Sequence, residues 1–298
     1  MSRSSIPLAQ PPRSGPYSGQ TVNSAQRFLA KQFQQAGFGD CEAEARDLVM
    51  AASGLTRAEL ITQATEFMSP ETVERVQQFS ARRLSGEPID NILGWREFYG
   101  RRFKVSVDVL SPRQETEEVT AKALELITAI NAPHILDLGT GSGAIAITLL
   151  SERPEATALA VDISKAALEV ASENAKAHDL TNRLTLSQSD WFETVAGHFD
   201  LIISNPPYID DVAMSELPRD VAEFDPSLAL RGGADGLSAY RLIAAAAKEY
   251  LKANGALVFE IGYDQGEAVL DILKRNGYRD TLLYHDIFQQ PRIVTARL

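Results

Sequence analysis

The sequence has very little cysteine and no long apolar run. Cys41 is the only cysteine among 298 residues, so an intrachain disulfide is excluded and a cysteine-based metal site is not expected. No apolar stretch approaches the roughly 20 residues that a membrane-spanning helix requires. The histidines show no ligand spacing either; they are His134, His178, His198 and His285. These absences favour a globular protein of a reducing compartment, without a metal, and we expect it in the cytoplasm.

Basic residues are also scarce relative to acidic ones. The net charge is −11, and residues 91–298 carry 20 basic side chains against 30 acidic ones. An acidic domain is poorly suited to wrapping a polyphosphate, because neutralised phosphates supply most of the non-specific affinity for nucleic acid. A basic protein is a better electrostatic match. The chain is long enough for one large domain and a smaller one, and we expect it to be a monomer.

The first residues differ in composition from the rest. Residues 1–20 are rich in Ser, Pro, Gly and Gln and have few large apolar side chains, which predicts a disordered tail. No acidic residue occurs before Asp40. That pattern is similar to an organellar transit peptide, but the tail is the interpretation that we favour.

Helical signals follow over residues 21–90. Thr56 precedes Glu59 at the spacing of a capping box, and Ser69 precedes Pro70 as in the first turn of a helix. No set of catalytic side chains is evident there, so recognition or support is the expected role. Residues 91–113 change character: two extended runs around Gly100, the first beginning near Ile89, predict a β-hairpin linker.

Strands and helices alternate through residues 114–298, which predicts an α/β domain with a mainly parallel sheet. The strand at 134–138 leads directly into Gly139-Thr140-Gly141-Ser142-Gly143 and a helix. Glycines allow close approach of a ligand, and the helix start offers free N–H groups. Asp162 ends the next strand and is placed to accept hydrogen bonds from ribose hydroxyls.

The glycine pattern alone leaves an alternative open. Gly139, Gly141 and Ala144 also satisfy the dinucleotide pattern, so an NAD-dependent oxidoreductase competes. Asp137 argues against it, because a carboxylate before the glycines repels a pyrophosphate but attracts the ammonium of a methionine moiety.

The most informative stretch follows the strand at 199–204. It reads Asn205-Pro206-Pro207-Tyr208. Proline cannot donate to a sheet ladder, so the strand must end here in a stiff loop. The carboxyl edge of an open α/β sheet is where ligands bind. A side-chain amide and a ring at that place suit a planar NH₂ group of an amide or a base.

This tetrapeptide resembles that of methyltransferases acting on amide or amino nitrogens, and the rest of the chain resembles the release factor glutamine methyltransferase family. The matching segments include Ser111 to Glu117, Glu223 to Pro226 and Phe259 to Gly266. Gln114 replaces a proline usual in the family, and residues 288–292 depart from its usual tail. An adenine-N6 methyltransferase acting on DNA or rRNA shares the tetrapeptide and is the alternative.

The resemblance implies a Rossmann-like, seven-stranded methyltransferase domain, a helical domain that docks the substrate, S-adenosyl-L-methionine as cofactor and S-adenosyl-L-homocysteine as product. It also implies the substrate, the glutamine of the Gly-Gly-Gln loop of class 1 peptide chain release factors. The expected cofactor-binding residues are Asp137, Gly139, Thr140, Gly141, Asp162, Asp190, Trp191 and Asn205. The expected catalytic residues are Asn205, Pro206 and Tyr208, and Pro207 joins them in binding the substrate.

Overall fold

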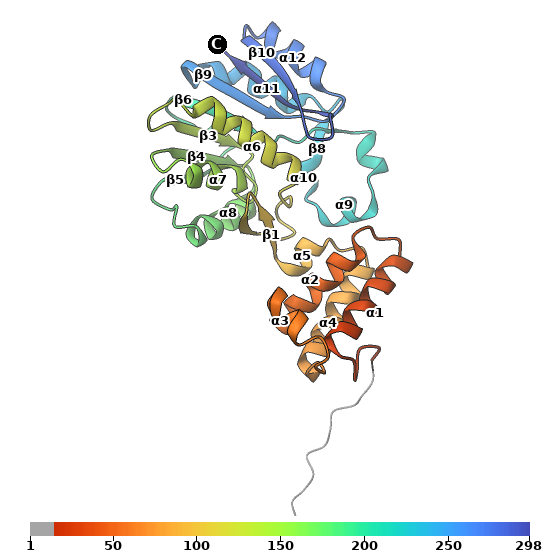
Figure 1. The fold of residues 1–298 in the computed structure, drawn as a ribbon. Helices are drawn as coiled ribbons and strands as arrows, with labels where there is room; N and C mark the ends of the chain where they lie inside the picture. Colours follow the sequence, from red (N-terminus) through yellow and green to blue (C-terminus); the bar gives the residue numbers. More distant parts are fainter. Residues whose placement is uncertain (1–14) are drawn as a thin grey trace, which may run out of the picture. The chain divides into compact units, whose positions relative to one another are not determined.

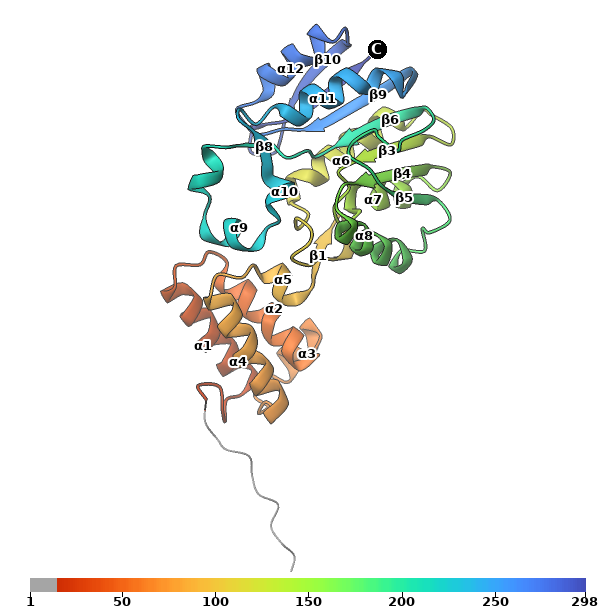
Figure 2. The same cartoon turned by 180° about the vertical axis from the view of Figure 1, so that it is seen from behind.

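The computed structural model describes residues 15–298. The chain divides into two compact units, Met1–Leu93 and Gly94–Leu298 (Figures 1 and 2). The predicted tail and the transit-peptide alternative fall largely on residues 1–14, which lie outside the described residues. Within residues 15–298, no helix is both long and apolar enough to cross a membrane.

The first unit is a helical bundle. Its helices are α1 (Val22–Gln35), α2 (Cys41–Ser53), α3 (Arg57–Thr62), α4 (Pro70–Leu84) and α5 (Ile89–Leu93). The predicted capping box is confirmed, since the Glu59 backbone donates to Thr56 Oγ1 and the Thr56 backbone donates to Glu59 Oε2 at 2.8 Å. Ser69 caps α4, and Pro70 opens it. These local signals succeed because they satisfy the N–H groups that a helix start leaves unpaired.

The prediction of a disordered tail is wrong for residues 15–20. Tyr17 is buried in the core of the helical unit. Its hydroxyl donates to Ser80 Oγ at 3.0 Å, and its ring packs edge-on against Phe28. A single aromatic side chain therefore anchors a segment whose polar composition suggested no packing.

The extended run predicted from Ile89 is also wrong at its start. Residues 89–93 form α5, where the backbone N–H groups of Asn91 and Ile92 bond to the Pro88 carbonyl, and Ile92 packs into the helical core. The hairpin itself is present: β1 (Trp95–Phe98) pairs antiparallel with β2 (Arg101–Lys104). Its buried rings, Phe98 and Phe103, belong to the core of the second unit.

The second unit is built on a seven-stranded sheet with the order β10-β11-β9-β6-β3-β4-β5 (Figure 1). The strands are β3 (His134–Leu138), β4 (Thr157–Asp162), β5 (Leu184–Gln188), β6 (Phe199–Ser204), β9 (Leu251–Glu260), β10 (Arg279–His285) and β11 (Pro291–Arg297). β11 runs antiparallel to β9 and β10, while β9, β6, β3, β4 and β5 are mutually parallel. The expected seven-stranded, Rossmann-like fold is confirmed.

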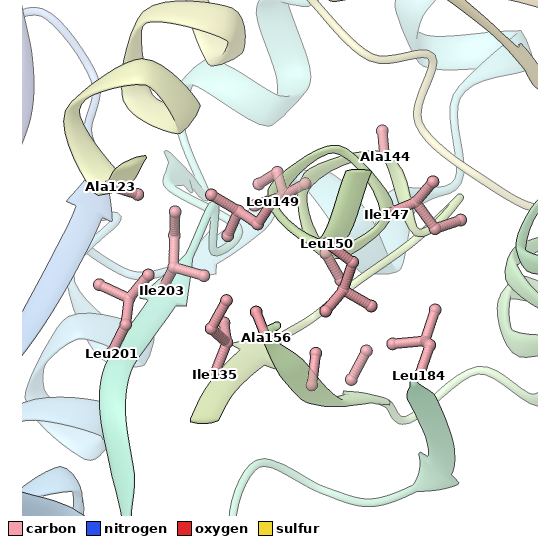
Figure 3. Packing of buried hydrophobic residues seen from close by; sticks show 14 of the residues in the cluster. Ala123, Ile135, Ala144, Ile147, Leu149, Leu150, Ala156, Leu184, Leu201 and Ile203 are labelled. Atoms are coloured by element: carbon pink, nitrogen blue, oxygen red, sulfur yellow. The ribbon is translucent and has the colours of Figure 1, made fainter. Parts of the chain in front are cut away.

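Helices cover both faces of this sheet. They are α6 (Gln114–Ile127), α7 (Ala144–Glu152), α8 (Lys165–Ala177), α11 (Ser238–Ala246) and α12 (Gly266–Arg275). Alternate residues of a strand point to opposite faces, and β6 illustrates this: Leu201 and Ile203 pack on the side of α6 and α7, whereas Ile202 packs on the side of α11 and α12. Figure 3 shows the first of these cores.

A segment with short helices and strands connects β6 to α11. It contains the parallel pair β7 (Ile209–Asp210) and β8 (Arg231–Gly233), with η1 (Ala213–Glu216), α9 (Arg219–Phe224) and α10 (Ser227–Leu230) between them. In this pair the backbone of Gly232 lies very close to the segment that follows β6: a Cβ added to Gly232 would lie 2.8 Å from Tyr208 Cα. Only glycine permits this approach.

Candidate active site

A cavity of about 470 Å³ lies at the carboxyl edge of the parallel strands. Its walls include loops that follow β3, β4, β5 and β6, together with residues 108–113. The strand order reverses at β3, because β4 lies on one side of β3 and β6 lies on the other. Such a switch point is the usual ligand site of an open α/β sheet, and the volume suits a small organic molecule.

The glycine loop after β3 has the conformation that its sequence predicts. Gly139, Gly141 and Gly143 have φ values of +71°, +55° and +81°, a region that residues with a Cβ rarely adopt. At Gly143 a Cβ would lie 3.1 Å from the Ile147 side chain. Gly139 and Gly141 instead line the cavity, where their lack of a side chain leaves room for a ligand.

Asp162 connects the glycine loop to the next strand. It ends β4 and lines the cavity. Its Oδ2 accepts the backbone N–H of Gly141 and its Oδ1 that of Ser164, each at 2.9 Å. A carboxylate oxygen has a second lone pair, so Asp162 retains the capacity to accept hydroxyl groups from the cavity.

Asp137 lies beneath the glycine loop and does not line the cavity. It is fully buried, and Thr140 Oγ1 donates to its Oδ2 at 2.6 Å. Burial raises the pKa of Asp137 to about 7, although the hydrogen bond from Thr140 opposes the shift. Asp137 thus supports Thr140, which forms part of the cavity wall, and its contact with an ammonium group stays a prediction.

Asp190 and Trp191 follow β5, and both line the cavity. Trp191 has a φ of +50°, which is uncommon for a bulky residue, and its carbonyl accepts the hydroxyl of Ser189 at 3.0 Å. Its ring faces Gly139, where a Cβ would lie 4.0 Å from Cζ3. The ring also packs against the core beside α11 and α12, so Trp191 lies between the cavity and the core.

Only two of the four residues of the tetrapeptide after β6 line the cavity. Asn205 and Pro207 line the cavity, whereas Pro206 and Tyr208 do not. Burial raises the pKa of the Tyr208 hydroxyl, and the Tyr208 carbonyl accepts Gln265 Nε2 at 3.0 Å. The Asn205 amide reaches Thr116 on α6, with 3.5 Å between Nδ2 and Oγ1.

Three further residues at this edge of the sheet were not predicted from the sequence. Thr116 lines the cavity and donates to the buried Glu260 at 2.7 Å. Burial raises the pKa of Glu260 to about 7, which the Thr116 hydrogen bond and the charges of Arg292 and Arg113 oppose. Arg113 is a cavity residue at the start of α6. The segments containing these residues matched the family, but nothing in the sequence indicated that they meet.

The cavity residues fit S-adenosylmethionine. Asp162 offers a carboxylate to ribose hydroxyls, and Trp191 and Ile163 offer flat and apolar surface to an aromatic base. At Gly139 and Gly141 no side chain covers the backbone, so a ligand in the cavity can approach it closely. Among residues 15–298, no group of three or more His, Cys, Asp and Glu side chains is arranged to hold a metal ion.

Sheet order, glycine loop and cavity define a Rossmann-like enzyme, and the family comparison makes it an S-adenosylmethionine-dependent methyltransferase. The Methyltransferase small domain family matches residues 109–219, and the PrmC N-terminal domain family matches residues 24–94. A release factor glutamine methyltransferase of Cereibacter sphaeroides is 42% identical over 274 residues, covering 92% of this chain and 97% of the relative. The chain belongs to the release factor glutamine methyltransferase family.

Other comparisons agree. A release factor glutamine methyltransferase of Moorella thermoacetica is 42% identical over 278 residues, covering 93% of this chain and 98% of the relative. Among solved structures, the catalytic domain of hMettl16 in complex with MAT2A 3′UTR hairpin 6 superposes with a TM-score of 0.56 over 74% of this chain and 81% of that chain. Its 14% identity indicates a shared fold only.

Proposed function

We propose that this enzyme transfers the methyl group of S-adenosyl-L-methionine to the side-chain amide nitrogen of the glutamine in the Gly-Gly-Gln loop of class 1 peptide chain release factors, and so modulates translation termination. The observation that carries the proposal is the position of Asn205 in the cavity wall, beside the glycine loop. The names of the relatives, which cover nearly the whole chain, support the same substrate.

The chemical difficulty is that an amide nitrogen is a weak nucleophile, because its lone pair is delocalised into the carbonyl. The bound cofactor supplies an electrophilic methyl group on a positively charged sulfur. We assign Asn205 Oδ1 and the Pro206 carbonyl as acceptors for the two N–H groups of the substrate amide. They hold the nitrogen in line with the methyl carbon and stabilise the positive charge that develops on nitrogen.

No strong general base is required in this scheme. The nitrogen–carbon bond forms as the sulfur–carbon bond breaks, which leaves S-adenosyl-L-homocysteine. The nitrogen becomes acidic only once it carries the methyl group, and its proton then passes to solvent. Pro207, in the cavity wall, packs against the substrate amide and keeps it in place. The Pro206 carbonyl and the Tyr208 ring, which do not line the cavity of the free enzyme, join this contact only once the substrate is bound.

The helical unit is the proposed docking site for the release factor, which leaves the chemistry to Gly94–Leu298. The family match over residues 24–94 supports this division. Residues 91–298 have an excess of acidic side chains, so a basic loop is the expected complement. Raising the ionic strength should then raise the KM for the release factor more than the KM for the cofactor, because salt screens exposed charges.

The proposal is tested by incubating the purified protein with methyl-labelled S-adenosylmethionine and three acceptors: a release factor, the same factor with its Gly-Gly-Gln glutamine changed to alanine, and purified DNA or rRNA. Label on the first acceptor alone is the expected result, and it fixes both the reaction and the target residue. Label on nucleic acid alone would overturn the substrate and favour an adenine-N6 methyltransferase.

A further inference from the structure

The proposed role of Asn205 requires a defined orientation of its side-chain amide. An asparagine amide has one end that accepts hydrogen bonds, Oδ1, and one end that donates them, Nδ2. The substrate amide presents N–H groups, so only Oδ1 can bind it. With the reverse orientation two NH₂ groups would face one another. Some feature of the protein must therefore favour one of the two orientations.

The residue that contacts the Asn205 amide is Thr116, in the first turn of α6. Its side chain is buried and forms part of the cavity wall. Its hydroxyl lies 2.7 Å from Glu260 Oε2, and its oxygen lies 3.5 Å from Asn205 Nδ2. The second distance is long for a hydrogen bond, but contacts in free enzymes often shorten when the substrate binds.

A hydroxyl group has only one proton to donate. An ionised carboxylate only accepts hydrogen bonds. Ionised Glu260 therefore accepts the hydrogen bond that the Thr116 hydroxyl donates. The Thr116 oxygen can then offer Asn205 only a lone pair. Asn205 must meet it with Nδ2, which leaves Oδ1 as the end available to the substrate.

Glu260 is well placed to be a fixed acceptor. It is the last residue of β9 and is 1% exposed. Its backbone carbonyl accepts the Tyr240 hydroxyl at 3.0 Å, which anchors the end of the strand. The ionisable groups that interact with its carboxyl come from several elements; they are Arg113 and Glu115 at the start of α6, Tyr208 after β6, Tyr240 on α11 and Arg292 on β11.

We infer that Thr116 is a positioning residue for methyl transfer: with Glu260 as its acceptor, it sets the orientation of the Asn205 amide so that Oδ1 receives the substrate N–H. The inference rests on the proposed function, because it assigns the acceptor role of Asn205 to an amide substrate. A merely structural Thr116 would bury a hydroxyl group and affect stability alone.

Thr120 provides a matched control on the same helix. It is also a buried threonine, and its hydroxyl donates to the Thr116 carbonyl at 2.9 Å, so it bonds to the backbone and not to the tetrapeptide. Thr116→Val and Thr120→Val each remove one buried hydroxyl group and keep the branched shape. Thr116→Ser keeps the hydroxyl group and loses only a methyl group.

The experiment measures, at pH 8, kcat and KM for methylation of a release factor, the Kd for S-adenosylmethionine by calorimetry, and the Tm. Thr116→Val should lower kcat roughly tenfold to a hundredfold, the size expected for losing an interaction used in the transition state. Its cofactor Kd should stay within about twofold of the wild-type value. Thr116→Ser should restore most of kcat, and Thr120→Val should keep kcat near the wild-type value. Thr116→Val should have the lower Tm of the two valine variants, because it also leaves the buried Glu260 carboxylate without its donor.

Equal kcat values for Thr116→Val and Thr120→Val would overturn the inference. If Thr116→Val does not fold, Glu260→Gln is the second variant: its amide has a donor as well as an acceptor, so it no longer fixes the direction of the Thr116 proton, and kcat should fall there as well. An unchanged kcat for Glu260→Gln would also count against the inference. Absence of label on the release factor with wild-type enzyme would overturn the proposed function itself, and the positioning role with it.

Discussion

Two buried carboxyl groups, Asp137 and Glu260, support the two halves of the cavity in different ways. Each ends or nearly ends a parallel strand, each accepts a threonine hydroxyl, and burial raises the pKa of each to about 7. Asp137 meets a threonine 3 residues away. Glu260 meets one that is 144 residues away in the sequence. We call the cavity wall formed by Gly139, Thr140, Gly141 and Asp162 the proposed cofactor half, and the wall formed by Thr116, Asn205 and Pro207 the proposed substrate half. The cofactor half is thus organised locally around Asp137, whereas the substrate half depends on contacts between distant segments.

The largest effect should come from removing the proposed substrate contact. Asn205→Ala should lower kcat for methyl transfer roughly 10²- to 10³-fold, as for loss of one preorganised group that stabilises developing charge. The Kd for S-adenosylmethionine should change little, because the glycine loop and Asp162 are untouched. Single-turnover transfer and calorimetry measure the two effects, with Asn276→Ala as control. A parallel rise in Kd would place Asn205 in the cofactor half and break the comparison.

The next effect concerns the cost of burying the two charges. Both pKa values are raised to about 7 in the folded protein, from ordinary values of 3.8 and 4.5. Between these limits the folded state binds more protons, so the free energy of unfolding falls as pH rises. Asp137→Asn and Glu260→Gln cannot titrate. Each should reduce the loss of stability between pH 4 and pH 8 by on the order of 3 kcal/mol.

Urea unfolding followed by tryptophan fluorescence tests this prediction, because Trp95 and Trp191 both lie in the second unit. A slope that survives in Glu260→Gln but vanishes in Asp137→Asn would show that the two sites differ. In that case the charges of Arg292 and Arg113 would be keeping Glu260 ionised at lower pH.

A smaller effect is expected from Asp162, which lies in the cofactor half. Asp162→Ala removes the carboxylate that accepts from Gly141 and Ser164 and that faces the cavity. Hydrogen bonds to charged groups contribute about 1.5 to 3 kcal/mol, so the Kd for S-adenosylmethionine should rise roughly tenfold to a hundredfold. At saturating cofactor kcat should be nearly unchanged. Asp271→Ala, on the exposed surface of α12, is the control; a loss of kcat without a change in Kd would contradict the assignment.

The same contrast explains what the sequence predicted. The glycine loop, Asp162 and the end of β6 were predicted because each is encoded in a few consecutive residues, where backbone restrictions act directly. Thr116, Glu260 and Gln265 were not assigned a role, since their contacts depend on how α6 and β9 are placed by the whole sheet. The burial of Asp137 beneath the glycine loop was not predicted either, because its sequence position cannot distinguish a residue in the cavity wall from one beneath it.

The failures in the helical unit have a similar cause. Tyr17 lies in a polar segment, yet its ring finds a place in a core formed by α1 and α4. Residues 89–93 have apolar side chains compatible with a strand or a helix, and packing of Ile92 against the helical core decided the outcome. Short apolar runs are ambiguous in sequence for this reason.

The smallest predicted effect tests how firmly the substrate half is held. Three of the four hydrogen-bonding positions of the Gln265 amide are used: Nε2 donates to the carbonyls of Tyr208 and Gly236, and Oε1 accepts the Gly262 N–H. Gln265→Glu keeps the shape but puts a carboxylate oxygen against two carbonyl oxygens. Release of the Tyr208 carbonyl should lower kcat/KM for the release factor roughly tenfold, a loss equivalent to about one hydrogen bond.

The exposed Gln290→Glu adds the same charge elsewhere in this unit and should have kinetics close to wild type. The cofactor Kd should be unchanged in both variants, because neither residue lines the cavity. If Gln265→Glu also retains wild-type kcat/KM, the two prolines alone hold the tetrapeptide, and the substrate half is as local as the cofactor half. A tenfold loss of kcat/KM in Gln265→Glu but not in Gln290→Glu would instead show that the geometry of the tetrapeptide depends on a residue 57 positions away. Dependence on a distant residue is what distinguishes the substrate half from the cofactor half.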